Sequence, residues 1–143
     1  MEKRLFFLIN LAQHRLFQHV DLQAKQELGI SATQVAGVLF LAKNNASLQR
    51  DLATALGLNK AAASTLTARM EANGLVERQP CESDGRAWRI ALTGKAKTLL
   101  PAIRPLLLEL NQALTEGFSE EEIQVVLRFL NHVLNRFSNH TKA

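Results

Sequence analysis

The segment Leu48–Leu75 constrains the fold most strongly, because it predicts two short helices that meet at a sharp corner. Apolar residues recur at helical spacing over 48–56, and Gly57 follows where a left-handed residue would end a helix. Asn59 can then cap a second helix over 60–73. The segment therefore predicts a pair of helices joined by a turn.

The second helix of this pair has two different faces. Ala63, Leu66 and Met70 fall on one face, which we expect to pack inward. The other face carries small residues, hydroxyls and two cations, which suit close approach to a DNA major groove. Its residues are Lys60, Ala61, Ser64, Thr65, Ala68 and Arg69. The alternative is an ordinary helical hairpin with a solvated outer face, and the helix pair alone does not separate the two.

The pattern after the helix pair changes from helical to alternating. Residues 75–79 can form one strand. A second strand would place Trp88, Ile90 and Leu92 on one face, with Arg89 opposite. Asp84-Gly85 between them is a strong tight-turn signal, and Arg86 follows it. A helix pair followed by a β-hairpin with an arginine at its tip predicts a winged helix-turn-helix.

Two helices are expected before the pair. An amphipathic helix over 3–28 would stop at Gly29. The spacing of Ser31 and Gln34 is that of a capping box, which would start a helix reaching Lys43. Ser47 could then cap the first helix of the pair.

Two more helices are expected after the hairpin. Thr93 can cap a helix whose apolar run extends to Gly117, although Pro101 and Pro105 predict either a bend or a late start. Another capping box, Ser119–Glu122, opens the last helix. These terminal helices carry more leucine than a small head can cover, so we expect a second copy of the chain to bury the surplus.

The predicted architecture is therefore mainly α-helical with a small β-hairpin wing. Residues 29–93 would form the winged helix-turn-helix DNA-binding domain, and residues 1–28 and 94–143 the flanking dimerisation helices, in one continuous domain. A length of 143 residues and an apolar fraction of 47% suffice for one core.

Charge and cysteine content narrow the class of protein. The net charge is +4, of which residues 48–97 contribute +3, with eight cations against five anions. This distribution permits a polyanionic partner. A single cysteine, Cys81, excludes an internal disulfide framework and suits a reducing, cytoplasmic location. The first 14 residues lack a cleavage site or a membrane span, and the sequence contains no catalytic, cofactor or metal motif. We therefore expect neither an enzyme nor a membrane partner.

Short motifs in this order and spacing resemble the MarR family of bacterial transcription regulators. The matching residues are Ser31-Ala32-Thr33-Gln34, Leu52-Ala53, Leu56-Gly57-Leu58, Glu71, Gly74-Leu75-Val76-Glu77-Arg78, Asp84-Gly85-Arg86 and Leu92-Thr93-Gly94-Lys95. The resemblance implies a homodimer that binds a pseudo-palindromic operator in double-stranded DNA. It also implies a repressor that a small, commonly aromatic, effector releases.

The resemblance also implies roles for particular residues. Residues 60–69 would enter the major groove, and Arg86, braced by Asp84, would reach the minor groove or its phosphates. We include Arg89 among the DNA-binding residues. Where the family often has Ser, Thr or Arg, this chain has Ala61, Ala62 and Thr65, so base reading would depend more on methyl contacts and DNA shape.

Other residues have alternative interpretations. Cys81 among acidic residues is interpreted as an inert thiol rather than a redox sensor. His14 and His19, five apart on a helix, are splayed, which argues against a metal sensor. His14 and Arg15 are the nearest polar candidates for an effector crevice between the first, second and fifth helices. Trp88 is interpreted as the apolar anchor of the wing rather than as a nucleic-acid stacking platform.

Two alternatives to this function stay open. The winged head could instead serve as a protein-interaction module without specific DNA binding. A regulator without an effector, controlled by its own abundance, is the alternative to effector release.

Overall fold

The structure is a computed structural model that describes residues 1–81 and 84–138, and the side chains of residues 81–87 lie outside this description. The chain forms two compact units, residues 1–104 and residues 105–143. The boundary between them falls inside one helix, directly before Pro105.

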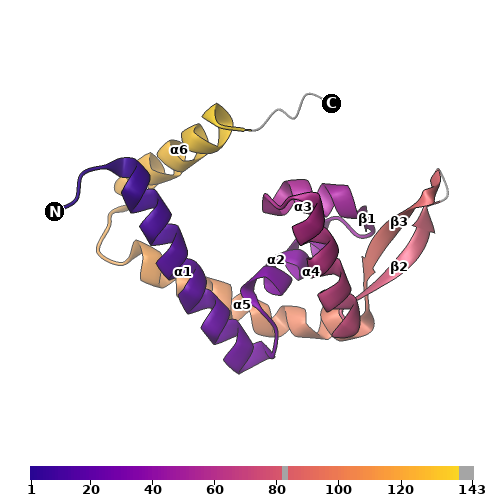
Figure 1. Ribbon diagram of the computed structural model, residues 1–143. Helices are drawn as coiled ribbons and strands as arrows, with labels where there is room; N and C mark the ends of the chain where they lie inside the picture. Colours follow the sequence, from indigo (N-terminus) through magenta and orange to yellow (C-terminus); the bar gives the residue numbers. More distant parts are fainter. Residues whose placement is uncertain (82–83, 139–143) are drawn as a thin grey trace. The chain divides into compact units, whose positions relative to one another are not determined.

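The fold is mainly helical with a small antiparallel sheet, as predicted (Figure 1). The elements are α1 (Leu5–Leu28), α2 (Ala32–Lys43), β1 (Ser47–Leu48), α3 (Gln49–Leu56), α4 (Lys60–Ala72), β2 (Val76–Cys81), β3 (Asp84–Leu92), α5 (Gly94–Thr115) and α6 (Glu120–Arg136). The sheet has the strand order β1-β3-β2, so a short third strand joins the predicted hairpin. In unit 1, the β2–β3 hairpin projects beyond α3 and α4 (Figure 1).

Local capping signals set most of the helix boundaries. Gly29 and Gly57 adopt left-handed conformations with φ of 71° and 67°, which a residue with a Cβ rarely adopts, and they end α1 and α3. The Asn59 side chain accepts a hydrogen bond from the backbone N–H of Ala62 at 2.8 Å, which confirms the predicted start of α4.

The predicted capping box of α2 forms only in part. The Ser31 hydroxyl accepts from the backbone N–H of Gln34 at 3.2 Å. The Gln34 side chain does not return this bond, because its amide oxygen accepts from the Asn73 side chain at 2.9 Å. The capping box of α6 is complete, since Ser119 and Glu122 bond each other's backbone N–H groups at 3.1 and 2.9 Å. The bonds from Ser119 lower the pKa of Glu122.

The prediction that Ser47 caps α3 is wrong. Ser47 lies in β1 and pairs with Ile90, and its hydroxyl donates to the Asn44 carbonyl at 2.5 Å. Leu48 occupies the N-cap position of α3 and makes no side-chain capping bond. Pairing with β3 determines the position of Ser47, and the local sequence does not reveal that pairing.

The position of the hairpin turn also differs from the prediction. Cys81 pairs with Asp84, so Asp84-Gly85 begins β3 instead of forming the turn. Strand β2 also extends to Cys81, beyond the predicted range 75–79, and the register of its pairing with β3 shifts between Pro80 and Cys81.

Helix α5 starts where Thr93 predicted. The Thr93 hydroxyl accepts from the backbone N–H of Ala96 at 3.2 Å. The helix continues through Pro101 and Pro105, so the predicted alternative of a late start is wrong. Each proline lacks the backbone N–H of a helix interior, and the boundary between the two units coincides with the second one.

The core of unit 1 lies beneath the helix pair. Its wholly buried large side chains are Leu41, Leu52, Met70, Leu75, Ile90 and Ile103. Helices α2 and α4 approach closely at Gly37, where a Cβ would come within 2.9 Å of the Met70 sulfur. A glycine at this position therefore brings the backbone of α2 against the buried side of α4.

Hydrogen bonds from α2 and α5 hold the C-terminal end of α4, in what we call the α4 junction. The Asn73 side chain donates to Gln34, and the Asn73 carbonyl accepts from Lys95 Nζ at 2.7 Å. The Gly74 carbonyl accepts from the Thr93 hydroxyl at 2.5 Å. These bonds satisfy carbonyls that the end of a helix leaves free, and they fix α4 against two other helices.

A second polar link joins α1 to α2. The Asp21 carboxylate accepts from Lys25 Nζ at 2.8 Å and from the backbone N–H of Ala32 at 2.9 Å. These two bonds, first that of Lys25, lower the pKa of Asp21. The stabilisation is therefore present above the pKa of an unfolded aspartate, and it is lost as the pH falls through the lowered pKa.

Replacing Asn73 with alanine should destabilise the fold by about 1–3 kcal/mol, because the amide oxygen of Gln34, a residue only 6% exposed, loses its donor. Urea unfolding followed by circular dichroism measures this change. Asn131→Ala is the matched control, since the Asn131 side chain is exposed and bonds only the Leu127 carbonyl of its own helix. The control should cost less than about 0.5 kcal/mol. An equally small cost for Asn73→Ala would contradict a stabilising role for the junction.

Candidate nucleic-acid interface

One face of α4 is open to solvent and the opposite face is buried. The six residues of the predicted outward face are all exposed, namely Lys60, Ala61, Ser64, Thr65, Ala68 and Arg69. Ala63, Leu66, Thr67 and Met70 are buried on the other side. The predicted division of the helix is therefore confirmed.

The hydroxyls on the exposed face of α4 differ from several other hydroxyls of the chain in their hydrogen bonding. The hydroxyls of Thr54, Thr67 and Thr98 donate to carbonyls of their own helices. Within the described part of the chain, those of Ser64 and Thr65 have no protein partner. A hydroxyl carries one donor and two acceptor lone pairs, so both groups are available to an external ligand.

The exposed face of α4 is held in place at both ends. The Asn59 cap orders its first turn, and the α4 junction fixes its C-terminal end. Between them, Met70 packs against Gly37 of α2. A binding face on a helix held by packing and hydrogen bonds is presented with little freedom to move.

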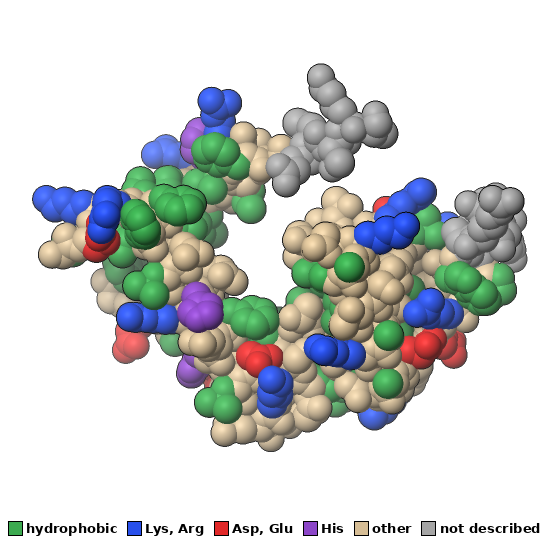
Figure 2. Space-filling model, in the orientation of Figure 1, with side chains coloured by type: hydrophobic (Ala, Val, Ile, Leu, Met, Phe, Trp, Pro, Cys, Tyr) green, Lys and Arg blue, Asp and Glu red, His purple; other side chains and the backbone are tan. Residues whose placement is uncertain are grey.

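The hairpin beside α4 carries several cations. Arg78 Nε lies 3.3 Å from a carboxylate oxygen of Glu71 on α4. The Arg89 guanidinium donates to the Ala46 carbonyl at 3.0 Å, which ties β3 to the loop before β1. Lys and Arg side chains are distributed over the surface of the helix pair and the hairpin (Figure 2). The hydrogen bond gives Arg89 a structural role that the sequence did not indicate, and its contact with DNA stays a prediction.

Three predicted residues of the wing fall at or near its end. The backbones of Asp84 and Arg86 belong to β3, and their side chains lie outside the described residues, as does that of Cys81. The bracing of Arg86 by Asp84 therefore stays a prediction.

Trp88 does not anchor the wing as predicted, because its side chain is 52% exposed. Ile90 and Leu92, on the same face of β3, are buried and provide the anchor. The reason is the length of β1, which pairs only with Ile90 and Arg89. Trp88 lies beyond these pairs, on a hairpin of two strands.

Asn45 contributes to the site through a contact that the sequence does not predict. Its side-chain oxygen accepts from the backbone N–H of Leu92 at 3.2 Å. Together with the bond from Arg89 to Ala46, it attaches the loop before α3 to the base of the hairpin. No local sequence signal marks a contact across so many residues.

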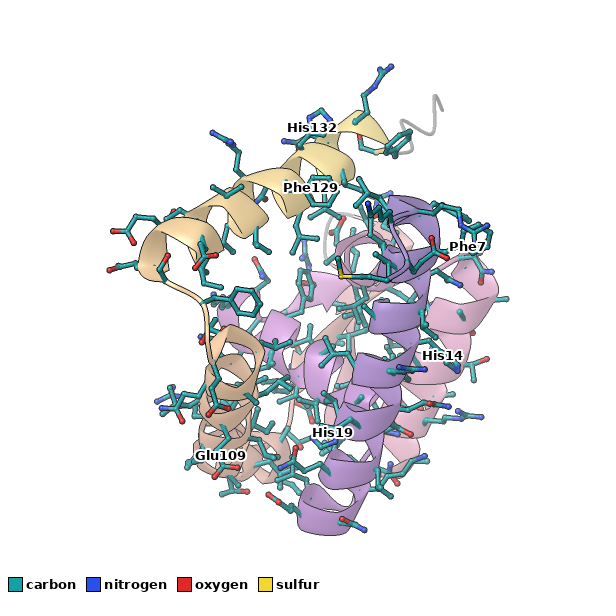
Figure 3. All side chains as sticks on the ribbon, turned by 90° about the vertical axis from the view of Figure 1, so that its left-hand side faces the viewer. Phe7, His14, His19, Glu109, Phe129 and His132 are labelled. Carbon is teal, nitrogen blue, oxygen red and sulfur yellow. The ribbon has the colours of Figure 1, made fainter. Side chains whose placement is uncertain are left out.

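The candidate effector residues lie on α1. His14 and Arg15 are both exposed. His14 and His19 project from different sides of α1 (Figure 3), as expected for residues five apart on a helix. Among the described residues, no three His, Cys, Asp or Glu side chains gather into a potential metal site. The described helices also include none long and apolar enough to cross a membrane.

Two helices carry exposed apolar side chains. Helix α6 has no buried residue, although it is strongly amphipathic in sequence. Its exposed apolar residues are Val125, Val126, Leu127, Leu130 and Leu134. The first half of α1 exposes Leu5, Phe6, Phe7, Leu8, Ile9 and Leu11. Figure 2 shows hydrophobic side chains at the surface of each of these helices.

Comparison with known proteins gives a family and a set of similar folds. Residues 28–87 match the model of the MarR family. A MarR transcription regulator from Oenococcus oeni is 27% identical, with 92% of this chain and 98% of that chain covered and a TM-score of 0.74. S. aureus MepR, in a complex with DNA, is 25% identical, with coverages of 94% and 99% and a TM-score of 0.86. The transcriptional regulator SlyA is 22% identical, with 94% of each chain covered and a TM-score of 0.87.

The matched segment contains the helix pair and most of the hairpin, and the similar structures extend over almost the whole chain, including the flanking helices. The winged helix-turn-helix segment of this chain therefore matches the MarR family, and the solved structures that share the fold of the whole chain include MarR and SlyA transcriptional regulators.

Proposed function

We propose that this protein is a dimeric, sequence-specific DNA-binding regulator that represses transcription, and that a small aromatic molecule releases it from its operator. The observation that carries DNA binding is the exposed face of α4, where the hydroxyls of Ser64 and Thr65 have no partner in the described part of the chain. Short polar side chains and methyl groups on one rigid helix match the donors, acceptors and thymine methyls of a major groove.

Cations around this face supply the part of binding that does not depend on sequence. Lys60 and Arg69 are exposed at the two ends of α4, and Arg50 is exposed on α3. Phosphate contacts of this kind position a protein on the duplex and make its affinity dependent on salt. The complex of MepR with DNA supports the same use of the fold in this chain.

The exposed apolar surface of the terminal helices supports dimerisation. Helix α6 leaves Leu130 and Leu134 exposed, the latter by 68%. Soluble proteins rarely leave a contiguous patch of this kind uncovered, and a symmetric second copy can cover it. Two heads joined in this way would bind two half-sites about one helical turn, ~10 base pairs, apart.

Release by an effector requires the ligand to favour a separation of the two heads that does not fit the operator. Differential affinity of a few kcal/mol suffices to shift such an equilibrium. We place the effector beside α1, with His14 and Arg15 as polar contacts. The alternative is a regulator without a ligand, controlled by its own abundance.

The competing function is a protein-interaction module that uses the winged head without specific DNA binding. Selection of bound DNA from a random duplex pool tests the proposal directly. A selected, inverted-repeat sequence would support it. Failure to enrich any sequence, together with a salt slope near zero for duplex binding, would favour the competing function.

Substitutions on the exposed face of α4 should alter sequence preference, whereas substitutions on the wing should alter the overall affinity for DNA. Thr65→Ala should change which sequences are selected, because a hydroxyl on α4 can bond base edges. Arg86→Ala should weaken binding to every sequence and make the slope of log affinity against log salt shallower by about one. Thr98→Ala is the control, since its hydroxyl bonds the carbonyls of its own helix, α5. If the Thr65→Ala protein selects the same DNA sequence as the wild-type protein, the hydroxyl of Thr65 does not contact the bases.

Charges placed on the apolar side of α6 should prevent dimerisation. The double variant Leu130→Glu with Leu134→Glu should yield unfolded or aggregated protein, because the proposed dimer would have to bury two unpaired charges. Gel filtration with light scattering measures the mass. The matched control carries the same two charges at exposed polar positions of α6, as Asn131→Glu with Asn135→Glu. If the variant with Leu130→Glu and Leu134→Glu is a folded monomer that binds the operator as tightly as the wild-type protein, the proposed dimer is refuted.

A thermal-shift screen with aromatic acids and phenols should find compounds that stabilise the protein and also lower its operator affinity. Such linkage is expected because a ligand that binds the folded state raises its stability. His14→Ala should weaken the effect of these compounds and preserve DNA binding. His19→Ala, on a different side of α1, is the control (Figure 3). If every stabilising compound leaves operator affinity unchanged, control by abundance is the better model for this chemical class.

A further inference from the structure

Trp88 combines a large apolar side chain with an exposed place on the hairpin. Its indole is 52% exposed, whereas Ile90 and Leu92 on the same strand face are buried. An isolated exposed apolar residue needs no explanation on most surfaces. Trp88 lies on the two-stranded part of the wing, beyond the residues of β3 that pair with β1. Its side chain is therefore too far along the hairpin to pack into the core.

The side of the hairpin that carries Trp88 is turned toward α4. Alternation along the strands places Trp88 beside Pro80, its directly opposite partner on β2, and diagonal to Arg78. Arg78 is on this same face, and its guanidinium reaches Glu71 of α4 at 3.3 Å. The face that holds Trp88 therefore borders the helix whose outer side we propose for the major groove.

The surroundings indicate the chemistry of the partner. An indole has two apolar ring faces and a single N–H donor, and it cannot accept a hydrogen bond. Deoxyribose supplies apolar C–H groups, and the adjoining phosphate supplies acceptors for the N–H. Arg78, diagonal to Trp88 on the same strand face, is exposed, and its guanidinium carries N–H donors besides the Nε that faces Glu71, which suit phosphate oxygens better than an apolar protein surface.

We propose that Trp88 contacts the sugar-phosphate backbone of duplex DNA where the wing meets the minor groove. This inference rests on the proposed function. The ring lies against deoxyribose and its N–H donates to a phosphate oxygen. Because sugars and phosphates carry no direct sequence information, Trp88 increases affinity for all duplexes without selecting among them.

The composition of the chain makes this contact directly observable. Trp88 is the single tryptophan, and the chain contains no tyrosine, so its fluorescence reports on one position. The probe is a generic duplex of roughly 30 base pairs at low salt, long enough for two half-sites. On titration, the emission of the wild-type protein should change in proportion to the bound fraction in a gel shift. Iodide should quench the emission of the complex less than that of the free protein.

Substitution of Trp88 tests how much its side chain contributes to the affinity for duplex DNA. Trp88→Ala should weaken duplex binding about tenfold at each salt concentration and leave the salt slope unchanged, because the side chain is neutral. Trp88→Phe should recover part of this loss, since it keeps an aromatic ring without the N–H. Leu22→Ala is the control, as it removes an apolar side chain of similar exposure, 59%, from α1. Thermal unfolding of each variant checks that the fold is preserved.

The possible results separate this inference from the proposed function. If the wild-type protein binds duplex and its emission and iodide quenching stay unchanged, the contact is refuted while DNA binding stands. The same conclusion follows if Trp88→Ala is folded and binds as tightly as wild type. If no duplex binds at low salt, the proposed function fails and the contact fails with it. Wild-type fluorescence decides the question even if Trp88→Ala does not fold.

Discussion

The close packing of α2 on α4 is the constraint on which the candidate interface depends. A helix of 13 residues is marginal by itself in water, so α4 owes its position to its buried side and its ends. Gly37 lets the backbone of α2 reach Met70, and the hydrogen bond from Asn73 to Gln34 fixes the C-terminal end beside it. Because these contacts all lie on the buried side of α4, the residues on the exposed side are not needed for packing. They can therefore be alanines and hydroxyl-bearing residues that are available to a ligand.

Helix boundaries were predictable because their signals act over three or four residues. Asn59, Thr93 and Ser119 each bond a backbone N–H three residues ahead, and a sequence shows such spacing directly. Two of the errors have a common cause in pairing over long distances. Ser47 joins Ile90 across 43 residues, and the oxygen of Gln34 is taken by Asn73 across 39. A local motif cannot show that a distant partner competes for one of its groups.

The candidate interface was predictable to the same extent and for the same reason. The exposed residues of α4 follow from helical periodicity alone, which fixes every side chain relative to its neighbours. The exposure of Trp88 does not, because alternation assigned it to the same face as Ile90 and Leu92 without showing where the core ends. That limit is set by β1, a strand of two residues that no periodicity can reveal. Arg89 shows the opposite kind of limit: the sequence suggested a cation that binds DNA, and the structure shows that its guanidinium also donates to the Ala46 carbonyl.

The small residues of α4 also bear on how such a regulator could discriminate among operators. Ala61 and Ala68 have no polar side-chain atoms, so the hydroxyls of Ser64 and Thr65 supply the short polar groups of the middle of this face. Few direct hydrogen bonds to bases leave a larger share of discrimination to the shape and deformability of the duplex. Shape is read through contacts with the sugar-phosphate backbone at more than one place along a groove. A regulator with this face would therefore depend on α4 and the wing being held at a fixed distance. The bonds of Asn45 and Arg89 at the base of the hairpin, together with the α4 junction, maintain that distance.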